Sequence, residues 1–352
     1  MTASTRVLVA MSGGVDSSVA AALLLERGVD VTGVTMKLWG GESDTGCCSV
    51  ADVDDARRVA ATLGIDHHVF NFGDDFETRV IGPYVAEHAA GRTPNPCIEC
   101  NRHIKFDKLL RRAAALGFDV VATGHHARVR RRADGTWRIS RGADGAKDQS
   151  YVLGMLGQPA LARVVLPIGD LTKDEVRARA GRLGLRTAGK PDSQDVCFIA
   201  STVPRAGFLG RRVALHPGRV IDAGGREVGR VDAVELVTVG QRKGLGLSGG
   251  GAEPRYVVDV DVPAATITIG GRHELVTDEV GLRSVAWADE PVAGELLAQC
   301  SAHGEAHRAV VEVPAPGVAT VRWRRPQRRV APGQTVVLYE GDDVVGSGLA
   351  AA

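Results

Sequence analysis

Short apolar runs alternate with longer amphipathic segments along the first half of the chain. The runs lack the polar–apolar alternation of a half-exposed strand, so they predict strands buried on both faces, as in a parallel sheet. The intervening segments have helical periodicity, and several end at a glycine that suits a left-handed C-cap. The predicted strands are residues 7–11, 31–36, 68–70 and 120–123, and the predicted helices are residues 15–27, 52–63, 105–116 and 172–183. This alternation predicts a doubly wound α/β domain.

The pattern changes after about Ser201, where glycine, proline and β-branched residues dominate and long helical periods disappear. A hairpin is predicted at residues 220–228, around Gly224-Gly225. Further strands are predicted at residues 256–262, 266–269, 310–313, 319–323 and 335–338. We therefore expect three domains: an α/β domain at residues 1–203, a small β-rich central domain at residues 204–280 and a β-rich terminal domain at residues 281–352.

Composition narrows the class of protein. The 352 residues are 44% hydrophobic and 24% charged, with a formal net charge of +1, which is typical of a soluble globular protein. Nucleic-acid binding would therefore depend on local basic patches. The sequence has no apolar run long enough to span a membrane and no signal-peptide core near Met1, so a cytoplasmic protein is expected. Six cysteines are too few for a disulfide framework.

A glycine-rich loop, Ser12-Gly13-Gly14-Val15-Asp16-Ser17, joins the first predicted strand to the first predicted helix. The unpaired N–H groups and the dipole of such a helix N-terminus favour an anion such as a phosphate. The loop lacks the Gly-Lys-Ser/Thr of a P-loop NTPase and the G-x-G-x-x-G spacing of a dinucleotide site. Asp16 would repel a bare phosphate, which favours a role as a magnesium ligand or as a helix-start residue.

Three of the cysteines are candidates for chemistry. Cys97 and Cys100 form a C-x-x-C after Pro94-Asn95-Pro96, and Cys197 lies far along the chain. Three interpretations are open: buried thiols with a chance spacing, a zinc or iron–sulfur site, or two reactive cysteines. In the last case one cysteine carries a persulfide and the other resolves the intermediate as a disulfide. Cys300 stands alone in the β-rich region and is interpreted as a core residue.

The glycine-rich loop resembles that of the PP-loop ATP pyrophosphatases, which adenylate a carbonyl oxygen and release pyrophosphate. Further segments, in order along nearly the whole chain, resemble the tRNA-specific 2-thiouridylases (the MnmA/TrmU family). The matching segments are residues 10–17, 93–101, 104–106, 122–125, 147–151, 192–199, 240–246 and 332–334.

The resemblance implies a reaction, its cofactors and its partners. ATP, with Mg²⁺, adenylates the C2 oxygen of the wobble uridine of certain tRNAs, and sulfur then replaces AMP. A cysteine desulfurase or sulfur-relay protein would supply the sulfur, and the terminal domain would be a β-barrel that binds tRNA. We expect a monomer that engages one tRNA.

The resemblance also implies the site residues. Cys100 matches the nucleophile, and Cys197 matches the cysteine that carries the persulfide. The implied ATP-binding residues are Ala10, Met11, Ser12, Gly13, Gly14, Val15, Asp16, Ser17, Met36 and Gly124. The implied tRNA-contacting residues are Asn95, Pro96, Cys97, His125, Lys147, Asp148, Gln149 and Gln334.

Cys97 departs from the family pattern, because many members carry aspartate there, viewed as a base that helps to activate a cysteine. A thiol of ordinary pKa is a poor replacement for that carboxylate. Three cysteines do provide what an iron–sulfur cluster with one open coordination site needs, and such clusters occur in related tRNA thiolation enzymes. The persulfide route through Cys197 and Cys100 is preferred. The alternatives are thiolation through a cluster on Cys97, Cys100 and Cys197, and a PP-loop ligase acting on another substrate.

Two arginine-rich stretches offer a path for tRNA phosphates, although a solvated charged face is the usual meaning of such a stretch. The first follows the α/β pattern and contains Arg128, Arg130, Arg131, Arg132, Arg138 and Arg141. The second flanks Trp323 and contains Arg322, Arg324, Arg325, Arg328 and Arg329.

Overall fold

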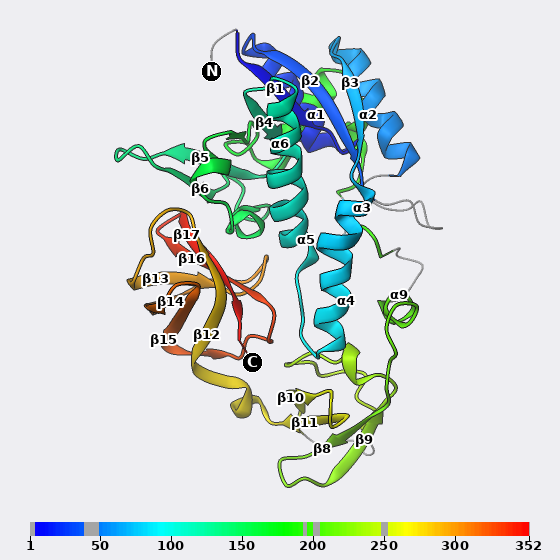
Figure 1. Cartoon of the computed structure of the whole chain (residues 1–352), viewed down its shortest axis with the longest axis vertical. Helices are drawn as coiled ribbons and strands as arrows, with labels where there is room; N and C mark the ends of the chain where they lie inside the picture. The colour runs from blue at the N-terminus through cyan, green and yellow to red at the C-terminus, as the bar shows by residue number, and fades with distance from the viewer. Residues whose placement is uncertain (1–3, 39–48, 193–195, 200–204, 248–252, 352) are drawn as a thin grey trace.

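A computed structural model of the chain describes residues 4–38, 49–192, 196–199, 205–247 and 253–351. Figure 1 shows an α/β part that carries the N-terminus, a β-barrel that carries the C-terminus, and a small β part at the lower end of the molecule. None of the described helices is long and apolar enough to cross a membrane. Cys47 and Cys48 lie outside the described residues, as do Ser193, Gln194 and Asp195 of the motif before Cys197.

The N-terminal domain is built on a five-stranded parallel sheet in the order β3-β2-β1-β4-β7. Its strands are β1 (Arg6–Ala10), β2 (Asp30–Lys37), β3 (His67–Asn71), β4 (Val120–Thr123) and β7 (Val164–Val165). In the central strand Leu8 packs into one hydrophobic cluster, while Val7 and Val9 pack into another. Because these three residues are completely buried, the prediction of a strand covered on both faces is confirmed.

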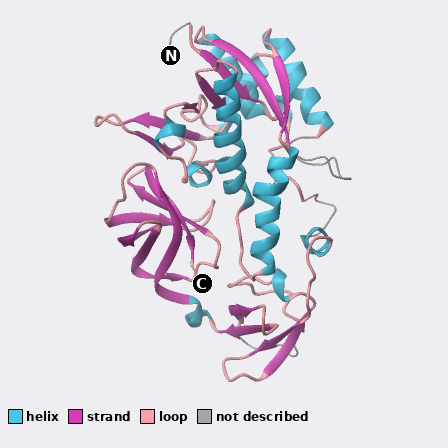
Figure 2. Ribbon diagram, viewed as in Figure 1, coloured by secondary structure: helices cyan, strands magenta, loops and turns pink. Residues whose placement is uncertain are grey.

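Helices cover both faces of this sheet (Figure 2). The cluster of Val7 includes residues of α1 (Val15–Glu26), α2 (Val50–Leu63) and α8 (Lys173–Arg182). The cluster of Leu8 includes residues of η1 (Glu77–Ile81), α4 (Gly82–Ala89), α5 (Pro96–Glu99), η2 (Cys100–Lys108) and α6 (Leu109–Ala115). Shorter helices are α3 (Gly73–Phe76), η3 (Ser150–Leu153), α7 (Gln158–Leu161), η4 (Arg186–Gly189), α9 (Arg205–Gly210), η5 (Val234–Leu236) and η6 (Arg272–Leu275). The doubly wound domain is therefore confirmed.

The central domain contains a four-stranded sheet in the order β10-β11-β8-β9. Its strands are β8 (Gly218–Ile221), β9 (Glu227–Val231), β10 (Tyr256–Asp261) and β11 (Thr266–Gly270). The predicted hairpin is β8–β9, and Gly225 takes the positive φ of 79° that its turn requires. A small apolar core that includes Val220, Val257 and Ile267 lies beneath the strands.

The C-terminal domain is a closed barrel, because β12 pairs with both β15 and β17. Its strands are β12 (Val276–Trp287), β13 (Gly294–Gln299), β14 (Ala306–Ala315), β15 (Val318–Arg328), β16 (Thr335–Glu340) and β17 (Asp343–Ala350). Strand β12 is continuous from residue 276, so the barrel sheet begins inside the range expected for the central domain.

The barrel sheet also extends into the first 203 residues of the chain. The hairpin of β5 (Ala127–Arg131) and β6 (Trp137–Arg141) joins its edge through a pairing of Ser140 with Asp343. The sequence analysis did not include this hairpin, because its residues were interpreted as an arginine-rich stretch, although apolar and polar residues alternate in both strands around Asp134-Gly135.

The segment that leads to Cys97 is held by all three domains. It follows the end of α4, where Gly91 packs against Val262 of the central domain. Thr93 donates its N–H to Pro332 O of the barrel at 2.8 Å, and its hydroxyl donates to Thr238 Oγ1 of the central domain at 3.2 Å. The position of this segment therefore depends on how the other two domains sit on the first.

Gly91 provides a test of this junction. A Cβ at Gly91, where φ is +73°, would lie 2.8 Å from Val262 Cγ2, whereas a Cβ at Gly64, where φ is +70°, would meet nothing within 4 Å. Both alanine variants carry similar backbone strain, so their difference measures the contact between domains. We expect Gly91→Ala to lower the free energy of unfolding by about 1–3 kcal/mol more than Gly64→Ala does, measured by urea denaturation. Equal losses would contradict the packing described here.

Candidate functional site

The glycine-rich loop leaves the N-terminus of α1 open. Gly14 is the extended N-cap residue and supplies no side-chain cap, so N–H groups of the first turn have no side-chain acceptor there. The hydroxyl groups of Ser17 and Ser18 donate to Gly14 O, and Ser12 N–H donates to Ser17 Oγ at 3.2 Å. The loop thus has a fixed shape with helix N–H groups available to an anion.

Two glycines are required by close backbone approach. Gly13 has φ +70°, and a Cβ there would lie 2.3 Å from Asp52 O on α2. A Cβ on Gly124, just after β4, would lie 2.5 Å from Ser17 N in the first turn of α1. These contacts explain why glycine is needed in the loop and why Gly124 belongs to the same site.

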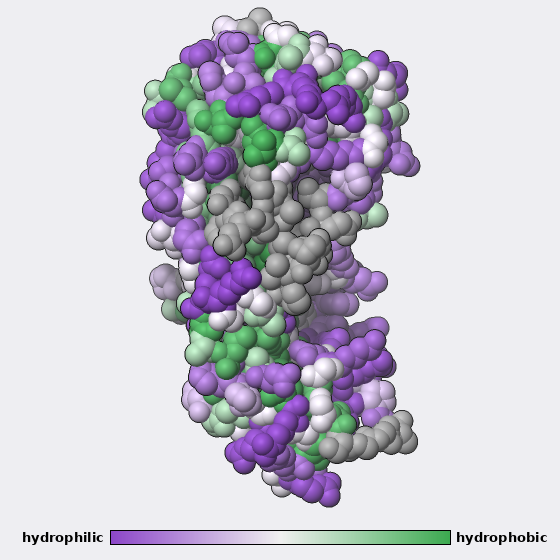
Figure 3. Space-filling model, turned by 90° about the vertical axis from the view of Figure 1, so that its right-hand side faces the viewer, coloured by the Kyte–Doolittle hydropathy of each residue, from purple (hydrophilic) through white to green (hydrophobic). Residues whose placement is uncertain are grey.

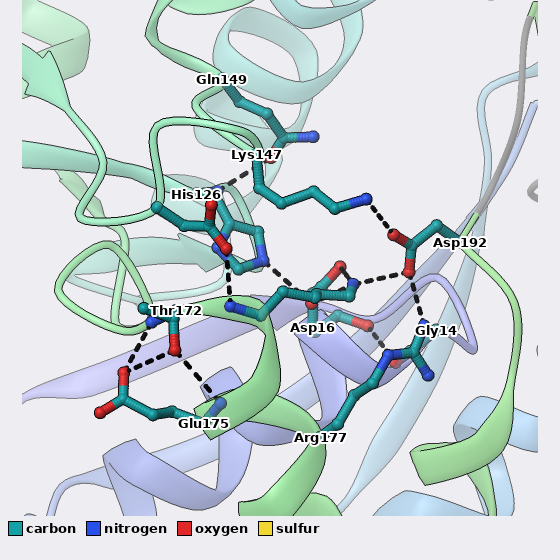
Figure 4. Close-up of polar contacts among 12 residues, drawn as sticks. Gly14, Asp16, His126, Lys147, Gln149, Thr172, Glu175, Arg177 and Asp192 are labelled. Atoms are coloured by element: carbon teal, nitrogen blue, oxygen red, sulfur yellow. Dashed lines mark hydrogen bonds and ion pairs between the residues drawn. The ribbon is translucent and has the colours of Figure 1, made fainter.

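Charged side chains from four segments meet beside this loop (Figure 4). Asp16 accepts from Lys173 Nζ at 2.7 Å and from His126 Nε2 at 3.1 Å. Lys173 Nζ also lies 2.8 Å from Asp192 Oδ1. Burial alone would raise the pKa of Asp16, but the hydrogen bonds from His126 and Lys173 and the charge of Lys173 outweigh burial and hold that pKa below its ordinary value. The Asp16 carboxylate is therefore held ionised.

Asp192 forms ion pairs with three cationic side chains. Besides Lys173, it accepts from Lys147 Nζ at 2.7 Å and from Arg177 at 2.9 Å. Burial would raise the pKa of Asp192, but the hydrogen bonds and charges of Lys147 and Lys173 lower it well below the ordinary range. A single carboxylate therefore occupies the centre of a cationic cluster beside the open end of α1, which is where a phosphate group would find its partners.

Lys190 ties the loop to α2. Its Nζ donates to Gly13 O at 3.0 Å, to Asp52 at 2.7 Å and to Asp55 at 2.8 Å. Burial would lower the pKa of Lys190, but its hydrogen bonds with the two carboxylates raise it overall. The glycine-rich loop is thus fixed from both sides, by Lys190 and by Lys173.

The sequence analysis did not identify Lys173, Arg177, Asp192, Lys190 or His126 as site residues. One signal was available, because Lys173 is the first residue of α8, where a positive charge opposes the helix dipole. A buried lysine in that position indicates a nearby anionic partner. The partners themselves lie 157 and 19 residues away along the chain, so local patterns could not identify them.

The candidate cysteines occupy different environments. Cys97 is exposed on α5, and its N–H donates to Asn95 Oδ1 at 3.1 Å. Cys100 is buried at the start of the π-helical segment η2, a conformation that is often found at functional sites. Cys197 is half-buried. Burial raises the pKa of Cys300 to about 12, which agrees with its interpretation as an unreactive residue.

Cys100 and Cys197 pack against the same hydrophobic cluster. This cluster also contains Ala10 at the end of β1, and Met36 of β2 packs against it. Phe198 anchors the segment after Cys197, with ring centroids 5.7 Å from Phe76, 5.4 Å from Tyr84 and 5.2 Å from Phe208. The two cysteines therefore adjoin one hydrophobic cluster, which also contains Ala10 and contacts Met36, both implied in nucleotide binding.

The residues implied in tRNA contact are only partly on the surface. Lys147 pairs with Asp192, and Gln149 accepts the N–H of His126 at 2.9 Å, so both border the charged cluster. Asp148 is enclosed, because it accepts from Arg141, from Gly142 N–H and from Ser150.

The other implied contacts lie elsewhere. His125 is buried, bonded to Thr123 at 2.6 Å and packed on Phe106, and burial lowers its pKa well below the ordinary value. It is therefore neutral and faces the interior. Gln334 follows the Pro332 contact with Thr93, which brings it to the segment that leads to Asn95, Pro96 and Cys97.

Three family models match this chain, one in each of the three regions described above. Residues 5–201 match the family model described as "tRNA methyl transferase HUP domain", residues 206–271 match a "tRNA methyl transferase PRC-barrel domain", and residues 277–350 match an "Aminomethyltransferase beta-barrel domain". A curated protein of Mycobacteroides abscessus, named tRNA-specific 2-thiouridylase MnmA, is 48% identical over 97% of this chain and 98% of its own length. The protein of the same name from Roseiflexus sp. is 46% identical, with the same coverage. The chain belongs to the tRNA-specific 2-thiouridylase family.

In this member of the thiouridylase family, carboxylates of the same chain neutralise most of the first arginine-rich stretch. Four of its arginines lie within salt-bridge distance of carboxylates: Arg128 with Asp170, Arg132 with Glu340, Arg138 with Asp289 and Arg141 with Asp148. In the second stretch, Arg322 pairs with Glu279 and Glu312, and Arg324 pairs with Glu295. Many of the arginines that the sequence suggested for tRNA binding therefore form ion pairs within the thiouridylase itself.

The charge balance at Asp192 predicts a pH-dependent contribution to stability. Because its folded pKa is depressed, the stabilisation is present above the ordinary aspartate pKa of about 3.9 and is lost as the pH falls below it. We expect Asp192→Asn to unfold at a lower temperature than wild type from pH 7 to about pH 5, with the difference shrinking below about pH 4.

Asp66→Asn is the matched control, because Asp66 is exposed and forms no ion pair with the described residues. Its melting temperature should follow that of wild type across the same range. A difference for Asp192→Asn that grows on acidification would contradict the assignment.

Proposed function

We propose that this enzyme catalyses the ATP-dependent 2-thiolation of the wobble uridine of tRNA, with release of AMP and pyrophosphate. One observation carries the proposal: Ala10 and Met36, next to the glycine-rich loop, share a hydrophobic cluster with Cys100 and Cys197. A nucleotide-activating centre and two thiols in one interior suit activation of an oxygen followed by its replacement with sulfur. The family relationship supplies the acceptor, because the named relatives are tRNA-specific 2-thiouridylases.

The proposed ATP site is the loop Ala10 to Ser17 with Met36 and Gly124. The phosphates take the place of the Asp192 carboxylate among Lys147, Lys173 and Arg177, so nucleotide binding exchanges one anion for another beside the buried Lys173. Mg²⁺ is usually held by one or two carboxylates together with phosphates, and Asp16 is the residue that would contribute here. When bound, the ion would neutralise charge on the leaving pyrophosphate.

Uridine C2 needs this activation because its oxygen is a poor leaving group. Adenylation makes that oxygen part of a phosphate ester. The backbone N–H groups of the glycine-rich loop and the side chain of Lys173 stabilise the negative charge that develops on the phosphates. We assign the segment from Asn95 to Cys97 to the target base, which must leave its stack to reach the cysteines.

The proposed sulfur transfer is balanced in atoms and electrons. The outer sulfur of a Cys197 persulfide attacks C2 of the adenylated uridine, and the Cys100 thiolate attacks Cys197 Sγ. The S–S bond of the persulfide breaks, its electron pair stays on the transferred sulfur, and AMP leaves with the former C2 oxygen. A Cys100–Cys197 disulfide results, which a cellular thiol must reduce before the next turnover.

The persulfide itself comes from a partner, for which we propose a cysteine desulfurase or sulfur-relay protein. We further propose that the enzyme acts in the cytoplasm as a monomer on one tRNA.

The iron–sulfur alternative is not favoured by the residues present. A cluster would need Cys97, Cys100 and Cys197 to converge, yet across the described ranges no group of three His, Cys, Asp or Glu side chains is placed to hold a metal ion. Cys97 is exposed while Cys100 is buried. The proposed transfer therefore uses the persulfide route, in which no cluster takes part.

The cysteine roles predict a clear ranking of variants. Cys100→Ser and Cys197→Ser should each lower the rate of tRNA thiolation by roughly a thousandfold or more, while ATP binding is retained, because each removes a reacting sulfur. Cys300→Ser, a matched change at another half-buried cysteine, should leave the rate unchanged. Cys97→Ser should keep the rate within about tenfold of wild type. The measurement is 2-thiouridine formed in unmodified tRNA. Iron bound by anaerobically purified enzyme and lost in Cys97→Ser would instead support the cluster.

Lys173 provides a test of the nucleotide site. Lys173→Gln should raise the KM for ATP by about 10- to 100-fold, because a charge-assisted contact to phosphate contributes about 1.5–3 kcal/mol. Lys108→Gln removes a lysine that pairs with Asp75 away from the loop and should leave that KM unchanged. Steady-state pyrophosphate release at varied ATP, with saturating tRNA, measures both. Equal KM values for the two variants would argue against a phosphate contact from Lys173.

A further inference from the structure

A glycine-rich loop of the central domain has a well-defined backbone conformation and no role in the proposed reaction. This loop, Gly240-Gln241-Arg242-Lys243-Gly244-Leu245-Gly246, has three glycines with positive φ, at 86°, 74° and 56°. A Cβ on the last of them would lie 2.1 Å from Arg230 O, so the loop lies directly on the backbone of β9. Leu245 is 2% exposed in the core of the domain. The loop is therefore seated on the domain at its C-terminal end.

Hydrogen bonds fix the other end. Gly240 N–H donates to Val257 O at 2.7 Å, and Val257 N–H donates back to Gln241 O at 2.9 Å. The Gln241 side chain accepts from Thr238 N–H at 3.2 Å and donates to Lys243 O at 2.8 Å. The conformation at Arg242 and Lys243 is thus set by its surroundings rather than left to solvent.

The charges at the tip are not neutralised. Arg242 and Lys243 are exposed, and within the described part of the chain no carboxylate lies within salt-bridge distance of either. Arg328 of the barrel adds a third cation beside the loop. It donates to Gly240 O and lies over the Tyr256 ring, and no carboxylate of the described residues lies within salt-bridge distance of it. This loop therefore differs from the first arginine-rich stretch, in which four of the six arginines lie within salt-bridge distance of carboxylates. Hydrophilic residues cover much of this lower end of the molecule (Figure 3).

The loop is also connected to the active-site segment. Thr238, which precedes it, contacts Thr93, and Thr93 leads along the chain to Asn95 and Cys97. An anion held by the loop is thereby placed at the junction that positions the segment assigned to the target base.

We propose that the 240–246 loop is a phosphate-binding anchor for the tRNA backbone, with Arg242 and Lys243 as its contacts. This inference rests on the proposed function, because it takes the ligand to be the tRNA that is thiolated. The fixed backbone lowers the entropy lost on binding, and unpaired cations release counterions from the nucleic acid. Neither contact reads a base, so the loop positions the tRNA and confers no sequence preference.

The test is the double variant R242Q/K243Q, with binding of unmodified tRNA measured across a salt series. We expect the slope of log affinity against log salt to fall in magnitude by about 1.4–1.8, the value for two phosphate contacts. The KM for tRNA should rise about tenfold or more, with kcat and the KM for ATP unchanged. R182Q/R186Q removes the same charge from exposed positions on the nucleotide domain and should leave the slope unchanged.

A second variant separates charge from shape. Gly246→Ala keeps both cations, but its Cβ would clash with Arg230 O and displace the loop. It should therefore also weaken tRNA binding. Its melting temperature shows whether the domain remains folded. An unchanged salt slope in R242Q/K243Q, while wild type thiolates tRNA, would overturn the anchor and leave the proposed function standing. Loss of sulfur delivery from the donor protein with intact tRNA binding would likewise overturn it, in favour of a protein-docking loop. Wild type that neither binds nor thiolates tRNA would refute the proposed function itself.

Discussion

The ammonium group of Lys173 lies between the carboxylates of Asp16 and Asp192, and the arrangement of the whole site depends on this charge balance. Lys173 is 8% exposed at the first position of α8, where both burial and the helix dipole disfavour a cation. Two anions must therefore stay close to it. One comes from the first turn of α1 and the other from the segment that leads to Cys197. Three segments distant in sequence are thus brought to one point by the need to neutralise one buried charge.

The same principle separates the basic residues into two groups. In the β5–β6 hairpin, carboxylates elsewhere in the protein form ion pairs with Arg128, Arg132 and Arg141 and neutralise their charge. Arg242 and Lys243 have no such partner among the described residues and remain available to an anion outside the protein. In a chain with a formal net charge of +1, the position of unpaired cations matters more than their number.

The features that were predictable from the sequence are those encoded within a few neighbouring residues. The buried run of β1, the open turn at Gly13 and Gly14, and the left-handed Gly64 are all set by local backbone and burial requirements. The attachment of the β5–β6 hairpin to the barrel was not predictable in this way, because Asp343, the partner of Ser140, lies some 200 residues away. The contacts of Lys173 and Asp192 likewise form only after the chain has folded, so neither a motif nor a period could assign them.

The environment of Cys97 bears on which sulfur chemistry the fold can support. Only two residues lie between Cys97 and Cys100, yet Cys97 is exposed beside the Asn95 cap and Cys100 is buried in the cluster that Cys197 also contacts. A metal site on three thiolates would require the exposed and the buried side chains to face one point. Persulfide transfer requires only Cys100 and Cys197 to meet, and both already adjoin one core. The cysteine at this exposed position therefore lies outside the buried surroundings of Cys100, and the proposed transfer between Cys100 and Cys197 does not depend on it.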